Sequence, residues 1–479
     1  MENFNPNLLR FLKYLDFKIK CIKHQQDNPI RLDMDLAVKC RDELLLQQEQ
    51  KVLELKEVMP KVKKLKWQNR PKSTHKKDGS LSVAGTNWFK ALKENGINPA
   101  SQAAKEADRL KVFDKWGDPN PNSSDQVKAW LYELGWKPCT FKFVRNKETG
   151  DERQIEQVRK DGELTDSVLR LKKDTPEVEI LEGLTIIQHR LGIFKGFVEC
   201  AIERDGKHYL RAEIGGLTNT LRFKHKKPLV NLPGIDKPWG KEIRGCLIAD
   251  GGEVFIGADM TSLEDTTKRH YIYPLDPEYV NEMSEEGFDP HLDLALHAGA
   301  ITEEELEKHK SGEIDLGPIR KKYKAANYSC VYGVGAPKLA RETGMTKKEA
   351  AKVIEDYWKR NWAVRKVAQE QFTKEVGGYT WLKNPVSGFW HELRYDKDRW
   401  STTNQSTAVY IFDSWLARAR IKGYNGQGQF HDETLASVSD ESQAREALKQ
   451  GIEMLNKDLK LNVDFGIDVK SGKDYAEVH

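Results

Sequence analysis

Leucine and valine recur at helical spacing among charged residues between positions 35 and 66, and this pattern predicts one long helix. Pro60 is expected to kink or end that helix, because proline lacks the N–H that a helix interior requires. The polar stretch 67–85, rich in Lys, Ser and Gly, predicts a loop or insertion. Helical spacing returns in three later segments, at 99–115, 125–134 and 165–204.

Two shorter features lie between these helices. Ser123 or Ser124 is suited to cap helix 125–134, since a serine hydroxyl accepts a hydrogen bond from a free N–H of the first turn. The segment 143–163 is charged and turn-like.

From about residue 205 the pattern changes to short apolar runs separated by glycine clusters. KHYLRAEIGG (207–216) and GEVFIGADM (252–260) predict strands, and QGQFHDETLASVSD (427–440) predicts two short strands around a turn. Helices are predicted at 302–310, 318–376 and 441–458, followed by a short strand near 462–468. Because helices and strands come in blocks and do not alternate, the expected fold class is α+β with an antiparallel sheet.

The composition narrows the class of protein. The chain has 479 residues, 38% of them hydrophobic and 32% charged, which suits a large core divided over several structural units. No stretch approaches the roughly 18 consecutive apolar residues of a membrane helix, and charges interrupt the N-terminus, so neither a membrane partner nor a signal peptide is expected. The six cysteines are scattered, which favours reduced thiols and a cytoplasmic location.

The formal net charge is only +4, but the charge is unevenly distributed. Residues 61–77, KVKKLKWQNRPKSTHKK, contain no acidic residue. Such a run suits contact with a phosphate backbone, although a solvated loop would have the same composition.

The segment RKKYKAANYSCVYGVG (320–335) predicts a helix with two different faces. An α-helix turns about 100° per residue. One stripe is therefore the expected buried face: Ile319, Tyr323, Ala326 and Cys330. A second stripe carries two cations and then two aromatic rings: Arg320, Lys324, Tyr328 and Tyr332. The cations suit a triphosphate and a ring suits a base or sugar, the alternative being an ordinary solvated surface; Gly333 and Gly335 then allow the chain to leave the helix.

Two acidic positions stand at predicted strand ends. Asp259 follows the apolar run FIGA, and Asp432 lies within HDE (431–433) at the turn of the predicted hairpin. Such carboxylates suit hard divalent cations, and two cations about 4 Å apart can activate a hydroxyl and stabilise a leaving phosphate. Each position alone is equally typical of a strand terminator or a polar hairpin tip.

Taken together, these residues resemble the motifs of family A DNA polymerases, the family of bacterial DNA polymerase I and its phage relatives. Arg320–x3–Lys324–x3–Tyr328–x3–Tyr332–Gly333 is similar to motif B, Asp259-Met-Thr-Ser-Leu-Glu264 to motif A, and His431-Asp432-Glu433 to motif C. Further segments resemble the family: TLRFKHKKPLVNLP (220–233), PNSSDQVKAWL (121–131), Asp289-Pro-His291 and the final His479. The resemblance runs from about residue 30 to the end and implies a right-hand polymerase fold with thumb, palm and fingers.

This resemblance implies template-directed, primer-dependent DNA synthesis from dNTPs, with two Mg²⁺ ions, or Mn²⁺ in their place, and release of pyrophosphate. Asp259 and Asp432 would hold the metals, supported by Glu433, and Lys324 is also a candidate proton donor. The implied nucleotide-binding residues are Arg320, Lys324 and His291 at the phosphates, Tyr328 and Tyr332 at the sugar and bases, and Glu264 as a barrier to a 2′-hydroxyl. The implied DNA-binding residues are Arg222, Gln405, His431, Lys63, Lys64, Lys66, Arg70 and Ser123. Many members have Phe at the position of Tyr328, and a tyrosine there implies ready incorporation of dideoxynucleotides.

The implied domains are an N-terminal segment (1–30), a thumb (31–160) with a basic insertion near 61–118, a palm in two parts (161–270 and 401–479) and fingers (271–400) that carry the motif B helix (318–333). No exonuclease motif precedes the thumb, so proofreading is expected to be absent from this chain. Two alternatives stay open: the activity resides on a separate exonuclease, or an exonuclease domain was cut off. The insertion falls where some phage members bind a processivity factor. The short form and small N-terminal part point to a phage enzyme in a bacterial host cytoplasm. A monomer is expected, with primed template DNA and dNTPs as its partners.

The sequence departs from the family pattern at Met260, Asp265, Thr266 and Ser401, which leaves details of minor-groove contact open. Two other interpretations stay open. One is a single-subunit RNA polymerase, against which Glu264 argues. The other is a non-catalytic DNA-binding protein on a decayed polymerase scaffold, against which the intact Asp259 and Asp432 argue.

Overall fold

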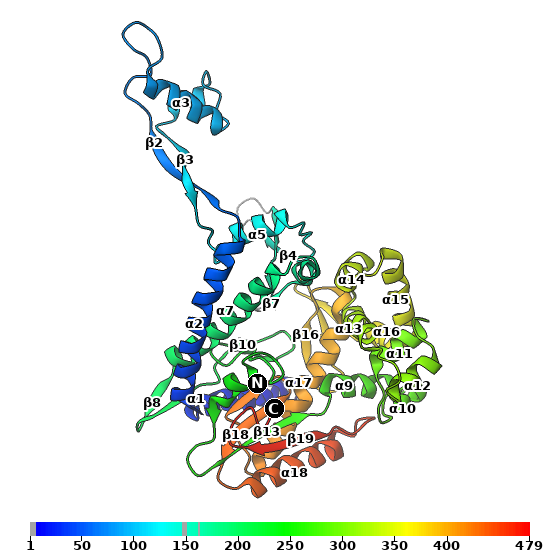
Figure 1. Cartoon of the computed structure of the whole chain (residues 1–479). Coiled ribbons are helices and arrows are strands. Elements are labelled where there is room, and N and C mark those ends of the chain that lie inside the picture. Colours follow the sequence, from blue (N-terminus) through cyan, green and yellow to red (C-terminus); the bar gives the residue numbers. More distant parts are fainter. Residues whose placement is uncertain (1–5, 146–150, 161–162) are drawn as a thin grey trace. The chain divides into compact units, whose positions relative to one another are not determined.

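The structure is a computed structural model that describes residues 6–145, 151–160 and 163–479 (Figure 1). The chain forms two compact units. The first combines Met1–Leu44 with Arg190–His479, and the second is Leu45–His189. Two long helices, α2 (Met34–Val58) and α7 (Glu177–Cys200), carry the chain from one unit to the other.

A four-stranded antiparallel sheet in the order β17-β18-β13-β19 forms the base of the first unit. Its strands are β13 (Val254–Met260), β17 (Gly428–Phe430), β18 (Glu433–Val438) and β19 (Ile467–Gly472). Alternate side chains of β13 pack in one core with α17 (Arg399–Ile421) and α18 (Glu441–Leu459). Gly451 is required there, because a Cβ at this position would lie 2.9 Å from the backbone nitrogen of Ala419 on α17.

The opposite face of this sheet carries Phe255 and Asp259, since successive side chains of a strand point to opposite faces. Near the end of the chain, Tyr475 packs on this face, with its ring centroid 6.4 Å from that of Phe255. One face of β13 is therefore covered by α17 and α18, while the other face carries the Asp259 carboxylate near the end of the strand.

A group of helices follows β13 in the first unit. Their bounds are α9 (Leu263–Ile272), α10 (Pro277–Glu282), α11 (Pro290–His297), α12 (Glu303–Lys310), α13 (Gly317–Val331), α14 (Ala336–Thr343), α15 (Lys347–Arg360) and α16 (Trp362–Glu370). Helices α11, α13, α14 and α15 share one apolar core. A three-stranded sheet then leads to η2 (Asp396–Asp398) and α17, with strands β14 (Thr373–Val376), β15 (Tyr379–Lys383) and β16 (Trp390–Glu392).

The N-terminal helix α1 (Pro6–Asp27) is fixed to α17 in the same unit. Lys18 Nζ lies 2.6 Å from Asp413 Oδ2, and both side chains are almost fully buried. The remaining elements of the unit form a second sheet in the order β12-β1-β9-β8 and a hairpin of β10 and β11. Their bounds are β1 (Ile30–Leu32), β8 (Ile202–Arg204), β9 (Lys207–Leu210), β10 (Ile214–Leu217), β11 (Phe223–His225), α8 (Gly240–Gly245) and β12 (Leu247–Ile248).

The second unit has two separate hydrophobic cores. In one of them, α2 and α7 pack with α5 (Ser124–Glu133) and α6 (Asp166–Leu169). Next to this core in sequence lie η1 (Arg170–Lys173) and the two-stranded pairs of β4 (Phe141–Arg145) with β5 (Glu152–Glu156) and of β6 (Arg159–Lys160) with β7 (Glu163–Leu164).

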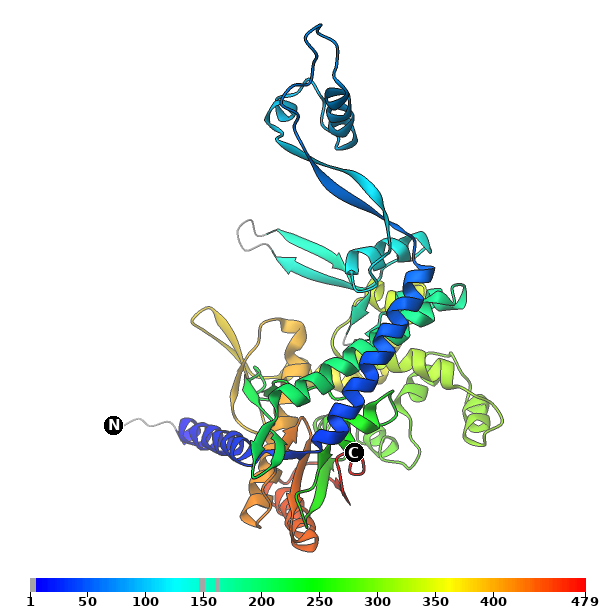
Figure 2. The ribbon, with the colours of Figure 1, turned by 60° about the vertical axis from the view of Figure 1, so that its left-hand side comes forward.

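The other core belongs to an inserted module between α2 and α5. Strands β2 (Val62–Asn69) and β3 (Arg109–Gly117) form a two-stranded antiparallel ribbon. Helices α3 (Val83–Glu94) and α4 (Gln102–Glu106) lie between these strands in sequence, and Trp88 is the largest side chain of their small core. Figure 2 shows the ribbon (blue) with α3 at its end.

Most predicted elements are confirmed. Strands β9, β10 and β13, hairpin β17–β18, and helices α5, α12, α13 and α18 stand where the pattern placed them. Ser123 is the N-cap of α5, and its hydroxyl accepts a hydrogen bond from the backbone N–H of Gln126. The predicted α+β class with an antiparallel sheet is correct.

The predictions around the inserted module were wrong. The helix predicted over 35–66 ends at Val58, because Pro60 follows, and 62–69 is strand β2, so part of the predicted loop is also strand. The predicted helix 99–115 contains only the short α4 and is otherwise strand β3. Residues 62–69 and 109–117 pair with each other across the insertion, and such distant pairing leaves no trace in local periodicity.

Four smaller corrections concern other predicted segments. The turn-like segment 143–163 contains strand pairs, although its residues 146–150 and 161–162 lie outside the described part of the chain. The helix predicted over 165–204 is divided and ends at Cys200, and the helical stretch 318–376 ends at Glu370, before β14. The last strand lies at 467–472, not near 462–468.

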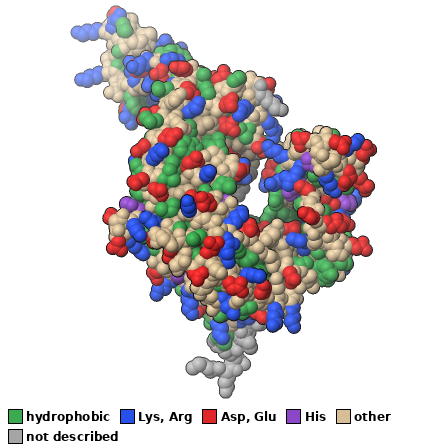
Figure 3. Space-filling model, turned by 60° about the horizontal axis from the view of Figure 1, so that its bottom comes forward, with side chains coloured by type: hydrophobic (Ala, Val, Ile, Leu, Met, Phe, Trp, Pro, Cys, Tyr) green, Lys and Arg blue, Asp and Glu red, His purple; other side chains and the backbone are tan. Residues whose placement is uncertain are grey.

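Two expectations from composition can also be compared with the structure. All six cysteines are free thiols, as their scatter predicted. Within the described ranges, no helix is both long and apolar enough to cross a membrane. Figure 3 shows side chains of both charge signs interspersed over the face that it views.

Candidate active site

The hairpin between β17 and β18 brings the acidic residues of the two distant segments together. Phe430 pairs with Glu433, so His431 and Asp432 are the two residues of its turn. His431 has a φ of 60°, the left-handed conformation that a two-residue hairpin turn requires at its first position. Across the sheet Asp259 pairs with Glu433, and the Met260 N–H donates a 3.0 Å hydrogen bond to the carbonyl oxygen of Asp432. The predicted convergence of β13 and the hairpin is therefore present.

The Asp259 carboxyl has a raised pKa. Desolvation, together with the nearby Asp432 and Glu433, raises the pKa of Asp259 to about 7. On the other side of β13, Asp468 of β19 is also paired with Asp259. Glu433 itself is buried and accepts a 2.7 Å hydrogen bond from the Tyr475 hydroxyl, with His479 Nδ1 at 3.6 Å. Tyr475 and His479 thus fix Glu433, while Asp259 and Asp432 have no comparable partner among the described side chains.

These oxygens suit a hard divalent cation. Within the described part of the chain, no three His, Cys, Asp or Glu side chains are grouped tightly enough to enclose a metal by themselves. Mg²⁺ does not require such an enclosure, because it is commonly held by one or two carboxylates together with water and substrate phosphates. Asp259 and Asp432 therefore fit a metal that is shared with a phosphorylated substrate.

Helix α13 has the two faces that its sequence predicted. Tyr323, Ala326 and Cys330 are buried, and Ile319 packs against the same core. On the other stripe, Tyr328 is 58% exposed and Tyr332 44% exposed, so neither ring belongs to a hydrophobic core. The helix ends at Val331 with Tyr332 as its C-cap, and Gly333 has a φ of 69°, as expected for the residue after a C-cap. Gly335 is the N-cap of α14.

Asp289 organises the cationic end of this stripe. It caps α11 by accepting hydrogen bonds from the N–H groups of His291 and Leu292, and it also accepts one from the Arg320 side chain. The His291 ring lies 5.5 Å from the Tyr328 ring, and Lys324 Nζ lies 6.0 Å from the same ring. Burial lowers the pKa of His291, the nearby Arg320 and Lys324 also lower it, and Asp289 opposes them only in part. The imidazole is therefore neutral at pH 7 in the free protein.

A cavity of about 370 Å³ lies beside this stripe. Helices α9, α11, α13 and α17 all contribute to its walls. Among its lining residues are Glu264, His291, Asn327, Tyr328, Tyr332 and Gln405. The size is in the range of small-molecule sites, and the lining combines aromatic rings with convergent polar groups.

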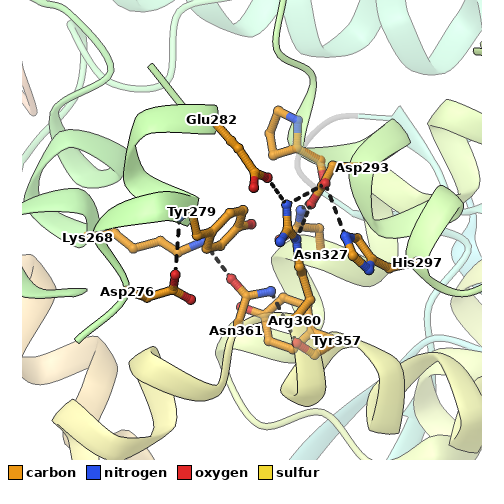
Figure 4. Close-up of polar contacts among 11 residues, drawn as sticks. Lys268, Asp276, Tyr279, Glu282, Asp293, His297, Asn327, Tyr357, Arg360 and Asn361 are labelled. Atoms are coloured by element: carbon orange, nitrogen blue, oxygen red, sulfur yellow. Dashed lines mark hydrogen bonds and ion pairs between the residues drawn. The ribbon is translucent and has the colours of Figure 1, made fainter. Parts of the chain in front are cut away.

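A partly buried ionic cluster lies next to the cavity (Figure 4). Arg360, at the end of α15, donates hydrogen bonds to Asp293 of α11 and Glu282 of α10, and its guanidinium lies 4.0 Å from the Tyr279 ring centroid. Burial alone would lower the pKa of Arg360, but these carboxylates outweigh burial and raise it. Nearby, Lys268 Nζ donates a 2.7 Å hydrogen bond to Asn361. The cluster ties four helices together next to the cavity.

Comparison with known proteins decides the family. A model of the family described as DNA polymerase family A matches residues 93–380. The chain belongs to this family.

Several polymerases are similar to this family A chain. DNA polymerase I, thermostable, from Thermus filiformis is 24% identical over 393 residues, which cover 78% of this chain and 44% of that protein. The DNA-directed DNA polymerase of Enterobacteria phage T3 is 24% identical over 306 residues, 61% of this chain and 38% of that protein. The chain thus spans less than half of the length of these relatives.

A solved structure supports the same fold. The POL domain of Pol1 from M. smegmatis, in complex with DNA primer-template and dNTP, superposes with a TM-score of 0.61 at 18% identity. The match covers 94% of this chain and 68% of that one. The fold of this chain is therefore that of a family A polymerase domain.

The structure gives partners to several residues that the motifs singled out. Arg222 donates a 2.7 Å hydrogen bond to Glu264, and its buried Nε has no acceptor among the described residues. Gln405 Nε2 lies 3.4 Å from the Tyr332 hydroxyl. The expected sugar barrier is thus paired with one expected minor-groove residue, Arg222, while the other, Gln405, is paired with Tyr332.

The departures from the family pattern are accommodated locally. Met260 is fully buried in the core below the sheet, and Thr266 is buried in α9. Asp265 forms an ion pair with Arg269, with Oδ2 and Nε 3.2 Å apart, and lines the cavity together with Ser401. Met260 ends strand β13 and points into the core on the face opposite Asp259, so it does not take part in the carboxylate site.

The predicted basic contacts lie in the second unit. Lys63, Lys64 and Lys66 are exposed on β2, and Lys66 pairs with Asp114 at 3.0 Å. Arg70 donates a 2.6 Å hydrogen bond to the carbonyl oxygen of Lys105 and so helps to close the inserted module. Ser123 uses its hydroxyl to cap α5.

Sequence reasoning missed four polar residues around the cavity. Asn327 donates a 2.9 Å hydrogen bond to the carbonyl oxygen of Pro290, and Asn404 donates one to the carbonyl oxygen of Glu264. Lys268 lines the cavity and donates a hydrogen bond to Asn361, while Arg360 lies behind the wall and is bonded to Asp293. Asn327 falls between the two stripes of α13, and the other three have spacings that match no motif, so only tertiary contacts reveal them.

Proposed function

We propose that this chain carries out template-directed, primer-dependent DNA synthesis, transferring a nucleotidyl group from a dNTP to a primer 3′-hydroxyl and releasing pyrophosphate. One observation carries the proposal: strand pairing places Asp259 and Asp432 at one end of the sheet, in a chain of family A. The cavity beside α13 is lined by the rings of Tyr328 and Tyr332, which suit a base or sugar. Arg320 and Lys324 lie on the same stripe of the helix and suit the phosphates of a nucleoside triphosphate.

Asp259 and Asp432 are the residues that would hold divalent metal, preferably Mg²⁺. When bound, the metal would lower the pKa of the primer hydroxyl and stabilise the leaving phosphate. Tyr475 fixes Glu433 at the side of this pair, so that the pair itself stays free to bind.

The residues of α13 and α11 would bind and orient the triphosphate. Arg320 is pre-positioned by Asp289, and Lys324 stands one helical turn further on. Lys324 is also placed to give a proton to the departing pyrophosphate. His291 is neutral in the free protein, so it would approach a phosphate oxygen as a hydrogen-bond donor.

The aromatic end of the stripe would select the sugar and base. Tyr328 would pack on the incoming nucleotide, and Tyr332 would abut the templating base. Glu264, fixed by Arg222, would occupy the space that a ribose 2′-hydroxyl needs. Arg222 and Gln405 would contact minor-groove acceptors, which are nearly alike in all base pairs, and so would test pair geometry.

The test is primer extension by the wild type and by Asp432→Asn, with Mg²⁺ or Mn²⁺. The wild type should extend a labelled primer with dNTPs, and the variant should lose at least about a thousandfold in rate, because one of two metal-binding carboxylates is gone. The variant should keep its thermal stability, since removing one of several crowded carboxylates relieves repulsion.

The matched control is Asp205→Asn. Asp205 also lies in a two-residue hairpin turn, between β8 and β9, and Asn-Gly suits that turn as well as Asp-Gly does. Equal extension by wild type and Asp432→Asn would refute the proposal. Substituting rNTPs for dNTPs in the same assay separates a DNA polymerase from an RNA polymerase, and a 3′-labelled primer reports any proofreading.

A further inference from the structure

One face of the β2–β3 ribbon in the inserted module is both aromatic and cationic. Cross-strand pairing puts Lys63 opposite Trp116, Leu65 opposite Phe113, Trp67 opposite Lys111 and Asn69 opposite Arg109. Paired and alternate residues of two strands share one face. We call this surface the ribbon face; its members are Lys63, Leu65, Trp67, Arg109, Lys111, Phe113 and Trp116.

The large apolar side chains of the ribbon face are not used to build a core. Trp67 is 53% exposed, Trp116 57% and Phe113 47%. On the other face of the ribbon, Leu110 and Val112 pack with Trp88 of α3, whereas Lys64, Lys66 and Lys115 are exposed. The solvent-exposed indole and phenyl rings lie on the face that points away from this small core, so they are available for a partner.

The cations of the ribbon face lie close to these rings. The Arg109 guanidinium is 4.4 Å and Lys111 Nζ 5.3 Å from the Trp67 ring centroid, and Lys63 Nζ is 5.8 Å from the Trp116 ring. The Phe113 and Trp116 rings meet edge to face with centroids 5.9 Å apart. The cations therefore hold the rings in place while their own charge still faces solvent.

The charge of the module favours a polyanion. Between residues 61 and 118 there are fourteen Lys and Arg and only six Asp and Glu, while the whole chain has a net charge of +4. The rest of the chain is consequently net acidic. A basic surface interleaved with exposed aromatic rings is the combination used to bind single-stranded nucleic acid, with phosphates on the cations and bases stacked on the rings.

We propose that the ribbon face binds single-stranded DNA. Side chains on one face of a strand repeat about every 6.6 Å, roughly twice the 3.4 Å rise of bases stacked in a duplex, so an extended, unstacked strand matches the ribbon better than a duplex does. The proposed polymerase function enters only in identifying the strand, which would be unpaired template.

The test measures binding of the full-length protein to a fluorescein-labelled oligo-dT of about 12 nucleotides, by fluorescence anisotropy without metal or dNTP. The variants are Trp67→Ala and Trp116→Ala. The matched control is Trp362→Ala, which removes an indole that is 43% exposed on α16 in the other unit. Each ribbon variant should weaken oligo-dT binding at least about fivefold, and the control should stay within twofold.

Two further measurements make the result specific. Lys111→Gln should reduce the dependence of log affinity on log salt concentration by about 0.7, the value of one single-strand phosphate contact. A blunt duplex of the same length should bind with little sensitivity to Trp67→Ala.

If both tryptophan variants bind oligo-dT like the wild type, the face serves another occupant, such as a protein, and the inference is wrong. It is also wrong if duplex and single strand are affected equally. Primer extension on a short, nearly fully paired template should be unchanged in the ribbon variants. If the wild type does not extend a primer, but its binding of oligo-dT still depends on Trp67 and Trp116, the polymerase proposal is refuted and this inference stands.

Discussion

The ring of Tyr328 lies on an exposed helix face, with its centroid 5.5 Å from that of the His291 ring and 6.0 Å from Lys324 Nζ. A hydroxyl at this position can make the contact that a nucleotide 3′-hydroxyl would otherwise make, and the protein should then accept dideoxynucleotides readily. Tyr328→Phe removes that hydroxyl without changing the ring. The preference for dNTP over ddNTP should rise about tenfold or more, the worth of one hydrogen bond to a charged group.

Competition between ddNTP and dNTP in single-nucleotide extension measures this preference. Tyr332→Phe is the matched control, since it makes the same change one turn further along α13 and should leave the ratio unaltered. An unchanged ratio in Tyr328→Phe would show that the hydroxyl has no part in sugar selection.

Single residues of the site were predictable where the signal is local. Arg320, Lys324, Tyr328 and Tyr332 share a helix, so their common face follows from 100° per residue alone. The partners of these residues come from elsewhere: Asp289 holds Arg320, and Arg222 holds Glu264 across 42 positions. Pairings of this kind depend on the folded chain, and no spacing rule contains them.

At the scale of elements, the attachment of α1 to α17 depends on a buried ion pair. The side chains of Lys18 and Asp413 are 2% and 3% exposed, Tyr14 donates a hydrogen bond to Asp413, and the Lys18 ammonium lies 4.0 Å from the Phe223 ring centroid. Removing one partner of such a pair leaves a buried charge unmatched, which costs about 3–5 kcal/mol. Asp413→Asn should therefore release α1, detected as faster proteolysis within 6–27 and a lower urea midpoint.

A control for this prediction lies on the same helix. Asp16 and Lys20 form an exposed pair, 60% and 63% exposed, so Asp16→Asn should change stability by less than about 1 kcal/mol. The double variant Lys18→Met/Asp413→Leu should recover most of the loss, because apolar residues of similar size replace buried ion pairs well. Equal proteolysis of Asp413→Asn and Asp16→Asn would contradict this role for the pair.

Elements themselves were predictable when their pattern was strong and their partners were near. Hairpin β17–β18 and helix α13 were found because turn chemistry and helical period are both local. Strand β2 was mistaken for helix, because its alternating Lys and Leu positions continue the charged pattern of α2 across Pro60. Only its pairing with β3, more than 40 residues later, makes it a strand.

For the whole molecule, the second unit, Leu45–His189, contains the segment that resembles a thumb, and we infer that it has that role. The inserted module of this unit has its own core around Trp88, separate from the core of α2, α5 and α7. A part with its own core can be removed without exposing apolar surface in the remainder.

The ends of the module also meet. Val62 and Gly117 are Cα partners in the antiparallel ribbon, so their Cα atoms lie about 5 Å apart. Residues 62–117 can therefore be replaced by Asn-Gly, which closes an antiparallel pair with a two-residue turn. The shortened protein should unfold within a few degrees of the wild type, because no contact of the larger core is lost.

The shortened protein should keep primer extension on a short template and lose most of its binding to oligo-dT. Extension on a short primed template should persist, since Asp259, Asp432 and the α13 cavity all lie in the other unit. Binding of oligo-dT should fall to the level of the Trp67→Ala/Trp116→Ala double variant, and the length of product made per binding event on a long single-stranded template should shorten. A shortened protein that folds but has lost short-template extension would show that the module takes part in the chemistry and does more than hold the strand.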